Sequence, residues 1–282
     1  MTMQRTRTIV WPRLGVWCRA AAVAIGLVAS AIPTVMAGTA GNGNTAGPRI
    51  EVNAMEYPWS AIGRLNAGGR GHCTGFLIGE RTVLTAAHCL YDPIEGRWRG
   101  PGEMHFIAGY QREAYILHSP VRSYERDLRF TMAAGATEEN AVVDWAVLEL
   151  AAPIGRQAGW LGLRSLNEAL IARVRRGEAR LIQAGYPRDR SHIMSANLDC
   201  AILGFFHEGA GILHSCPVAK GDSGSPLLTF ADGEIGVAGI HVLNARTKTG
   251  ETAGALSIGL FRPGSGARQA IAAARRAGAS SG

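Results

Sequence analysis

Short apolar runs bounded by glycine, proline or charged residues recur along most of this chain. Two of them, Thr74–Ile78 and Thr82–Ala86, flank Gly79-Glu80-Arg81, a spacing that predicts a β-hairpin. Val142–Leu150 is mostly apolar, which predicts a strand buried on both faces. The stretch Leu90–Met132 mixes short apolar runs with Gly, Pro and Arg, so one or two strands and long surface loops are expected there.

The same pattern continues in the second half of the chain. Leu227–Phe230 and Ile235–Val242 are separated by Ala231-Asp232-Gly233-Glu234, and Asp-Gly strongly favours a hairpin turn. Leu181–Gly185 and Asn197–Leu203 are two further strand candidates. Short strands at close spacing, with turn residues between them, favour an all-β barrel over alternating strands and helices.

Two segments have helical features. Ser165-x-x-Glu168 matches a capping box, and Gly177 is a suitable stop. Between them lies an apolar stripe at helical spacing, namely Leu166, Leu170, Ile171 and Val174. Within the Ala/Arg/Gly/Ser-rich tail, residues 264–282, the part Ala267–Arg276 is expected to form a short terminal helix.

The N-terminus has the pattern of a secretory signal peptide, which predicts export to the periplasm or the medium. Four arginines precede an apolar run from Ala20 to Ile32, and Val35-Met36-Ala37 offers small residues for cleavage after residue 37. The run has 13 residues, too few to span the roughly 30 Å of a bilayer core. Residues 38–49 then form a leader or propeptide.

Composition narrows the function classes. The chain is 47% hydrophobic and 18% charged, as expected of a globular protein with its own core. Its formal charge of +7 falls to +3 without the signal segment, which carries four arginines and no acid. Such a charge is not the footprint of a nucleic-acid-binding protein. Without Cys18, four cysteines remain, and an even number in an exported protein predicts disulfides.

Three distant segments carry the candidate chemistry. His88 lies in Thr85-Ala86-Ala87-His88-Cys89, Asp144 opens an apolar run, and Ser223 lies in Gly221-Asp222-Ser223-Gly224-Ser225-Pro226. A serine is a weak nucleophile unless a base removes its proton, and the base needs an orienting carboxylate. Each residue has a plainer reading, as a surface histidine, a strand-opening aspartate or a turn serine. Asp127 is the nearest rival acid, but it lies in a charged segment.

In this order, His, Asp and Ser resemble the trypsin/chymotrypsin-like serine peptidases, especially the bacterial branch that includes the glutamyl endopeptidases. The resemblance runs from about Ile50 to about Arg262. It implies two six-stranded antiparallel barrels, over residues 50–155 and 179–263, with the site between them. The helical segment would then belong to a linker over residues 156–178.

The resemblance also implies roles for the residues of these motifs. Ser223 would be the nucleophile, His88 its general base and Asp144 the group that orients His88. The backbone N–H groups of Gly221 and Ser223 would form the oxyanion hole. The function implied is hydrolysis of peptide bonds through an acyl-enzyme, acting on protein or peptide substrates as a monomer, without a cofactor or metal and without stable membrane association.

The four cysteines allow three pairings, and we favour Cys73–Cys89 with Cys200–Cys216, each 16 residues apart. The first pair resembles the family disulfide that fixes the histidine loop. A zinc site is the alternative, but no C-x-x-C pair supports it.

Asp222 suggests a regulatory step. In many members of the family this aspartate pairs with a new N-terminal ammonium after zymogen cleavage, and Arg49-Ile50 resembles such a cleavage point. The segment Glu51-Val52-Asn53-Ala54 departs from the family because it lacks the two glycines usual there. Alternatively, Asp222 bonds to local backbone or to another side chain.

The sequence says less about which residue the enzyme prefers before the scissile bond. Pro217 stands where trypsin-like enzymes have an aspartate, which argues against cleavage after Arg or Lys. His241 falls where glutamyl endopeptidases place a histidine that meets the substrate carboxylate, but Val218 replaces their usual hydroxyl residue. We therefore expect a preference for acidic residues before the scissile bond, with small or apolar residues as the alternative.

Other classes fit less well. An α/β-hydrolase esterase needs G-x-S-x-G, which Ser225 breaks, and a different order of the triad residues. No H-E-x-x-H motif is present for a zinc peptidase. A non-catalytic binding protein on the same scaffold remains the alternative function, although such proteins commonly lack a member of the triad.

Overall fold

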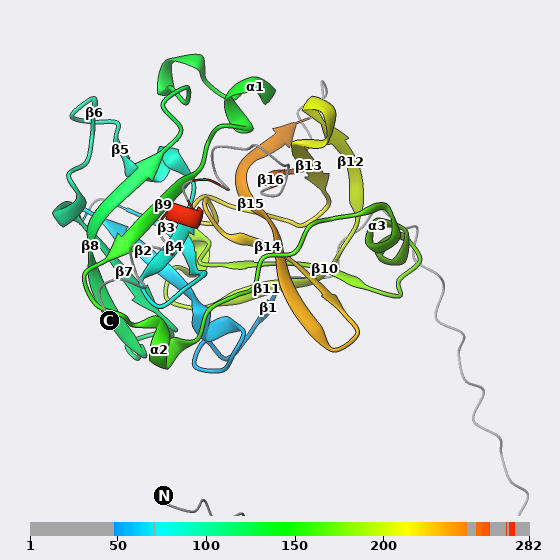
Figure 1. Cartoon of the computed structure of the whole chain (residues 1–282), viewed down its shortest axis with the longest axis horizontal. Helices are drawn as coiled ribbons and strands as arrows, with labels where there is room; N and C mark the ends of the chain where they lie inside the picture. The colour runs from blue at the N-terminus through cyan, green and yellow to red at the C-terminus, as the bar shows by residue number, and fades with distance from the viewer. Residues whose placement is uncertain (1–47, 70, 247–251, 260–268, 270, 274–282) are drawn as a thin grey trace, which may run out of the picture. The chain divides into compact units, whose positions relative to one another are not determined.

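Six antiparallel strands close on themselves to form the first barrel, in the order β2-β3-β4-β9-β8-β7 (Figure 1). The computed structural model describes residues 48–69, 71–246, 252–259, 269 and 271–273. The barrel strands are β2 Ile62–Ala67, β3 His72–Leu77, β4 Thr82–Thr85, β7 Met104–Ala108, β8 Leu117–Arg126 and β9 Ala146–Leu150. The predicted hairpin is confirmed, because β3 and β4 pair Phe76 with Leu84.

The second half is an eight-stranded sheet in the order β1-β11-β10-β14-β15-β16-β13-β12. Its strands are β1 Ile50–Glu51, β10 Arg180–Gly185, β11 Ser195–Cys200, β12 Ile202–Phe206, β13 Gly211–His214, β14 Pro226–Ala231, β15 Glu234–Arg246 and β16 Thr252–Gly259. Only Ala201 separates β11 from β12, which lie near opposite ends of this order. The covalent link through Ala201 therefore connects the two ends of the sheet. If β11 and β12 are counted as one bent strand, six strands surround the second core, and β1 is added at the edge.

The all-β fold is thus as predicted, but several elements differ. Leu90–Met132 contains four strands rather than one or two, because β5 Tyr91–Asp92 and β6 Arg97–Trp98 precede β7 and β8. The sequence of β8 lacks a clear apolar pattern because one of its inward positions is the fully buried Ser119. The strand expected at Val142–Leu150 begins only at Ala146, since α1 Glu138–Ala141 and a turn come first. A further short helix, α2 Gly155–Ala158, follows β9.

A helix lies between the two barrels in sequence, as expected, but it begins later than the capping box predicted. It is α3 Glu168–Arg175, and its N-cap is Asn167, whose side chain accepts from the Leu170 N–H at 2.8 Å. Leu166 and Ile171 both pack against the second core, so they form the hydrophobic staple of this start. A start at Ser165 would place Arg164 and Ala169 in those two positions and lose the staple.

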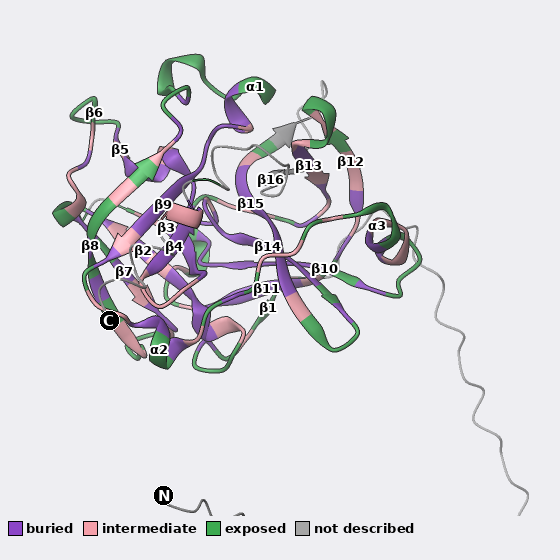
Figure 2. Cartoon of the chain, in the orientation of Figure 1, coloured by how far each residue is buried: buried purple, intermediate pink, exposed green. Residues whose placement is uncertain are grey.

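The buried residues, coloured purple in Figure 2, line the strands of both barrels. The larger cluster joins the first barrel to part of β10, β11, β14 and β15, and the smaller one lies beneath α3. Both predicted disulfides, Cys73–Cys89 and Cys200–Cys216, are present. The hairpin turn between β14 and β15 has Asp232 and Gly233 at φ +57° and +78°, as Asp-Gly predicts.

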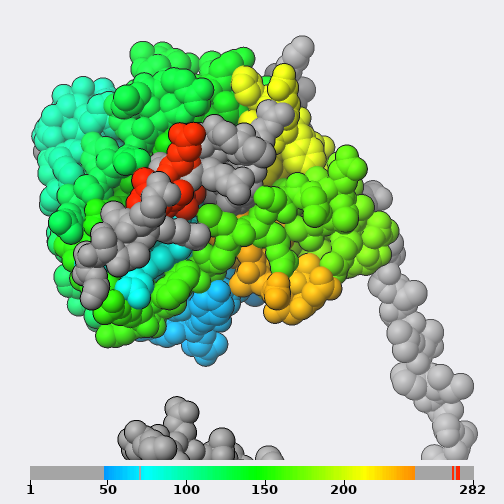
Figure 3. All heavy atoms as spheres, in the orientation of Figure 1, coloured from blue at the N-terminus to red at the C-terminus, as the bar shows by residue number. Residues whose placement is uncertain are grey.

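The predicted signal peptide and most of the predicted leader lie outside the described residues. Of the predicted terminal helix, residues 269 and 271–273 are described and helical. Ile271 is 4% exposed and joins the larger core cluster, and Figure 3 shows this segment in red against the first barrel. Among the described residues, no helix is long and apolar enough to cross a membrane.

Candidate active site

Pairing of β4 with β9 brings His88 and Asp144 together. Thr85 lies opposite Ala146 in this pair, so the chain leaving β4 and the chain entering β9 meet at one barrel end. His88 follows on a short 3-10 helix, Ala87–Leu90, and its Nδ1 lies 2.6 Å from Asp144 Oδ2. The backbone N–H of His88 donates to Asp144 Oδ1 at 2.8 Å. The carboxylate therefore fixes both the ring and the backbone of His88.

The electrostatics of the pair suit a general base. Burial favours the uncharged imidazole, but the charge and the hydrogen bond of Asp144 outweigh it, and the pKa of His88 is raised above its usual 6.5. Because Nδ1 faces the carboxylate, Nε2 is the nitrogen that remains for another partner. The side chain of Asp144 is 7% exposed and that of His88 is 25% exposed, so only the histidine opens to solvent.

Thr74 of the first barrel holds the loop that carries Ser223. The Thr74 N–H donates to the Ser223 carbonyl at 2.9 Å, and its hydroxyl donates to the Gly221 carbonyl, also at 2.9 Å. The disulfide between Cys73 and Cys89 joins Thr74 to the histidine segment, and Cys89 Sγ lies 3.7 Å from the Ser223 carbonyl oxygen. Ser223 thus lies beside the segment that contains His88. Sequence analysis had not identified Thr74.

Two glycines of this loop have no room for a side chain. A Cβ on Gly224 would lie 2.1 Å from Thr85 Oγ1, and one on Gly221 would lie 2.4 Å from the Tyr186 carbonyl oxygen. Gly221 also has φ +98°, which favours glycine. Among the described residues, no acceptor is found for the N–H of Gly221 or of Ser223, whereas the Asp222 N–H donates to the Ala219 carbonyl. The two candidate oxyanion donors are therefore available.

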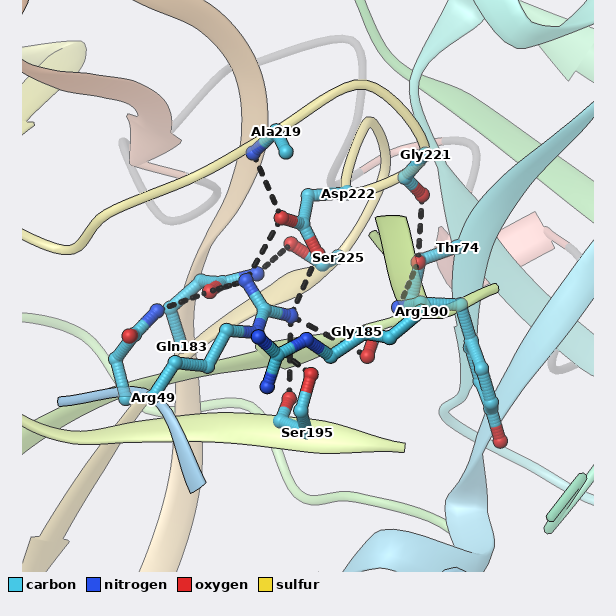
Figure 4. Close-up of polar contacts among 12 residues, drawn as sticks. Arg49, Thr74, Gln183, Gly185, Arg190, Ser195, Ala219, Gly221, Asp222 and Ser225 are labelled. Carbon is cyan, nitrogen blue, oxygen red and sulfur yellow. Dashed lines mark hydrogen bonds and ion pairs between the residues drawn. The ribbon is translucent and has the colours of Figure 1, made fainter. Parts of the chain in front are cut away.

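Asp222 lies between those donors and is paired with the side chain of Arg49. The carboxylate is fully buried, and Arg49 Nη1 and Nη2 donate to its two oxygens at 2.8 and 2.7 Å (Figure 4). The Ala219 N–H donates to the same carboxylate at 2.9 Å. Sequence analysis offered two partners for Asp222, a new N-terminal ammonium or nearby backbone and side chains. In this structure Asp222 bonds to a backbone N–H and to a side chain. The predicted cleavage between Arg49 and Ile50 is not needed to give it a partner.

Of the predicted specificity residues, His241 is the one buried beside the serine loop. Its carbonyl accepts from the Gly224 N–H at 2.7 Å, and its N–H donates to the Ser225 carbonyl at 2.8 Å. Burial lowers its pKa to about 4. Its ring lies edge-on to that of His214, with 6.0 Å between the centroids, and burial also lowers the pKa of His214. His214 was missed because a histidine ending an apolar run has no motif of its own.

The other two predicted specificity residues lie nearer the surface. Pro217 is exposed, and its carbonyl accepts from Asn197 Nδ2 at 2.9 Å. Val218 is half-buried against the smaller core cluster. Neither residue carries a charge that could pair with a basic substrate side chain.

An apolar pocket of about 280 Å³ adjoins His88 and Asp144. One wall is formed by Val242 and Leu243 of β15, and the other by the loop from Phe130 to Ala141. Sequence analysis left this loop without a role, because its mixed composition predicted only surface structure.

Cys73, His88 and Cys89 are the three side chains of the described residues that come close enough to resemble a metal-binding group. The two sulfurs are bonded to each other, so neither is a thiolate able to bind a metal. The zinc alternative for this pair of cysteines is therefore wrong.

The model of the family described as Trypsin matches residues 49–261. The chain belongs to the trypsin family. The match takes in His88, Asp144, Ser223 and Arg49, and it confirms the resemblance on which the sequence-based roles depend.

Two individual relatives match shorter parts of the chain. A glutamyl endopeptidase from Bacillus licheniformis is 30% identical over 139 residues, which cover 49% of this chain and 40% of that protein. A protein named extracellular metalloprotease from Bacillus subtilis is 27% identical over 122 residues, covering 42% and 37% of the two chains. The chain thus matches about two fifths of the length of these relatives.

Two solved structures of similar proteins share the fold. A Glu endopeptidase in complex with MPD superimposes with a TM-score of 0.63 at 17% identity, covering 83% of this chain and 98% of the other. Protease Anisep from Arthrobacter nicotinovorans gives a TM-score of 0.58 at 15% identity, covering 80% and 99%. These two structures therefore share the fold of this chain over about four fifths of its length.

Proposed function

We propose that this protein is an exported serine endopeptidase that hydrolyses peptide bonds through an acyl-enzyme. The observation that carries the proposal is the pair of bonds between His88 and the Asp144 carboxylate, beside a loop in which the N–H groups of Gly221 and Ser223 have no acceptor among the described residues. Membership of the trypsin family supports it. Export rests on the N-terminal sequence pattern and on the two disulfides, which form in oxidising compartments.

In this mechanism His88 takes the proton of the Ser223 hydroxyl through Nε2 as the oxygen attacks the substrate carbonyl. Asp144 keeps the ring in the required tautomer and stabilises the imidazolium. The Gly221 and Ser223 N–H groups bind the developing oxyanion, and each such donor contributes about 3 kcal/mol. The imidazolium then protonates the leaving amine, and water hydrolyses the acyl-enzyme by the same steps in reverse.

For specificity, we propose a preference for Glu or Asp before the scissile bond. His241 lies next to the serine loop and is uncharged at neutral pH, so it can donate one N–H to a carboxylate. The names of two similar proteins, glutamyl endopeptidase and Glu endopeptidase, support the same preference. The uncharged Pro217 and Val218 give no support to cleavage after Arg or Lys.

The test combines a serine-directed phosphonate with a peptide library that covers every residue before the scissile bond. We expect the exported protein to be labelled at Ser223 and to cleave mainly after Glu and Asp, and Ser223→Ala to do neither. Ser165→Ala, at an exposed position, is the matched control and should behave as wild type. Cleavage mainly after apolar residues would overturn the acidic preference alone. Folded protein without labelling or cleavage would favour the binding-protein alternative.

A further inference from the structure

Arg49 is unusual among the charged residues of this chain because its guanidinium is enclosed and bonded on every nitrogen. Its side chain is 10% exposed, although Arg49 is only the second of the described residues. Besides Asp222, it contacts four neighbours within the second barrel, one of which is the Pro217 carbonyl at 3.5 Å from Nη1. Nε donates to Ser195 Oγ at 2.6 Å, Nη1 to Gln183 Oε1 at 3.3 Å, and Nη2 to the Gly185 carbonyl at 3.3 Å (Figure 4).

We propose that Arg49, in the uncleaved chain, is the permanent counter-ion that holds the loop 221–223 in its active form. The enzyme would then be active without cleavage between Arg49 and Ile50, and such cleavage would remove the counter-ion from its anchored position. Arg49 would be a positioning residue that acts through Asp222. This inference rests on the proposed peptidase function.

Charge is the first argument. The Asp222 carboxylate is fully buried, and an ionised carboxylate in such a place requires a cation and further hydrogen bonds. Arg49 supplies the cation in the bidentate geometry that suits a carboxylate best. Both oxygens of Asp222 already accept hydrogen bonds, one from the guanidinium alone and the other from the guanidinium and the Ala219 N–H.

The second argument is the path from Asp222 to the chemistry. Asp222 lies directly between Gly221 and Ser223, so the position of its carboxylate sets the direction of both candidate oxyanion donors. Gly185 lets the carboxylate approach, because a Cβ there would lie 2.9 Å from Asp222 Oδ1. Removing the cation would leave the carboxylate unpaired in this tight space and favour a loop that turns it toward solvent.

The third argument is the anchoring of Arg49 itself. Strand β1 pairs Ile50 with Ala196 and Glu51 with Ser195 of β11. This register delivers the side chain of the preceding residue to Ser195, whose hydroxyl and carbonyl both accept from the guanidinium. A break after Arg49 would separate the guanidinium from the strand that positions it.

The two possible counter-ions differ at alkaline pH. A free α-ammonium loses its proton near pH 8, and one that is paired with a carboxylate loses it at a somewhat higher pH, whereas a guanidinium stays charged beyond pH 12. The titratable groups that face the ion pair are His72 of β3 and His241 of β15, and burial lowers the pKa of both. On β1 itself, Glu51 is paired with Arg112. Neither histidine changes charge above pH 7, so an alkaline loss of activity would not come from them.

The experiment uses the full-length chain, exported and purified, and begins with phosphonate labelling followed by intact mass measurement. We expect the labelled molecules to begin at or before Arg49. We also expect kcat/KM of wild type to stay level between pH 7.5 and 10. Labelled molecules that all begin at Ile50, with activity lost between pH 8 and 10, would overturn the inference. The mass measurement needs no variant, so it does not depend on how any substitution folds.

Variants then separate charge from structure. Arg49→Met should lower kcat by about 100-fold or more, the effect of losing an oxyanion donor, with a smaller change in KM. Arg49→Lys should recover part of the activity and lose it again toward pH 10, because a lysine has a pKa near 10.4. The matched control is Arg112→Gln, which removes an exposed arginine that pairs with Glu51, and it should behave as wild type.

The outcomes keep the two proposals apart. Wild type that no phosphonate labels would overturn the peptidase function. Labelled wild type together with a folded Arg49→Met of equal kcat would overturn the role of Arg49 alone. A lower kcat that Arg49→Lys does not restore at any pH would also count against a counter-ion and indicate packing instead.

Discussion

At the scale of single residues, the site depends on side chains whose partners lie far away in the sequence. His88 is fixed by a residue 56 positions later, and Thr74 holds a loop about 150 positions later. These bonds leave one imidazole nitrogen and two backbone N–H groups without partners among the described residues. The fold must therefore keep these three groups free of partners, because the proposed chemistry uses them.

Asp144 gives the first prediction at this scale. Asp144→Asn should lower kcat by about 10⁴-fold, because an amide no longer holds His88 in the required tautomer. The pKa of His88 is raised, and the base must be uncharged to act, so wild-type kcat/KM should fall as the pH drops below a midpoint above 6.5. In Asp144→Asn this midpoint should move to lower pH.

The rate measured between pH 5 and 9 checks both points. Asp127→Asn is the control, because Asp127 is an equally buried carboxylate that is bonded to Arg129 instead. An unchanged midpoint in Asp144→Asn would show that another group governs the acid limb.

Much of the candidate site could be predicted from the sequence, because its chemistry is carried by short local strings. Ser223, His88 and Asp144 each stand in a distinctive context. The partner of Asp222 could not be predicted in this way. It depends on the register of β1 against β11, which brings together residues 173 positions apart. His214 was missed for the same reason, since its neighbour His241 lies on another strand.

At the scale of elements, local patterns predicted the presence of a helix or strand more accurately than its first residue. The helix α3 is an example, because two possible caps stand two residues apart. The capping-box pattern favoured Ser165, whereas packing of Leu166 and Ile171 on the second core selects Asn167. Tertiary burial therefore decided between two starts of similar local quality.

This difference is measurable. Asn167→Ala should lower the free energy of unfolding by about 1 kcal/mol, because the Leu170 N–H loses its acceptor. Ser165→Ala, at an exposed position two residues earlier, should leave it nearly unchanged. Chemical denaturation of both variants compares them directly. Equal losses would mean that the Ser165 hydroxyl contributes to the helix start after all.

Four strands have no counterpart in the sequence-based prediction, namely β1, β2, β13 and β16, and the last two share a physical cause. β13 and β16 are held by pairing with each other across about 45 residues, and β16 is rich in glycine and alanine. Their stability comes from neighbours that a local pattern does not reveal. The link through Ala201 is equally hidden, although it joins two strands that lie near opposite ends of the second sheet.

At the scale of the whole molecule, burial of histidines links stability to pH. Burial lowers the pKa of His72, His214 and His241 in the folded chain, the last to about 4. Below pH 6.5 the unfolded chain therefore binds protons that the folded chain does not, and folding loses stability as the pH falls. The raised pKa of His88 has the opposite effect on stability, but it concerns one histidine, whereas three have a lowered pKa.

We therefore expect the thermal midpoint to drop between pH 6.5 and about 4, before most carboxylates titrate. His214→Gln should make the drop smaller, because one buried histidine is removed. His105→Gln, at an exposed position, should leave it unchanged. Differential scanning calorimetry over this pH range gives the comparison. A drop of the same size in His214→Gln would refute the contribution of that residue.

The bond between Arg49 and Asp222 also has a consequence for the order in which the site is completed during synthesis. A ribosome completes Arg49 early, but its carboxylate partner is made 173 residues later. Ser195, which receives the guanidinium from the other side, also comes late. A chain interrupted before this point carries an arginine without its acceptors. The position of Arg49 is thus fixed only after residue 222 has been made.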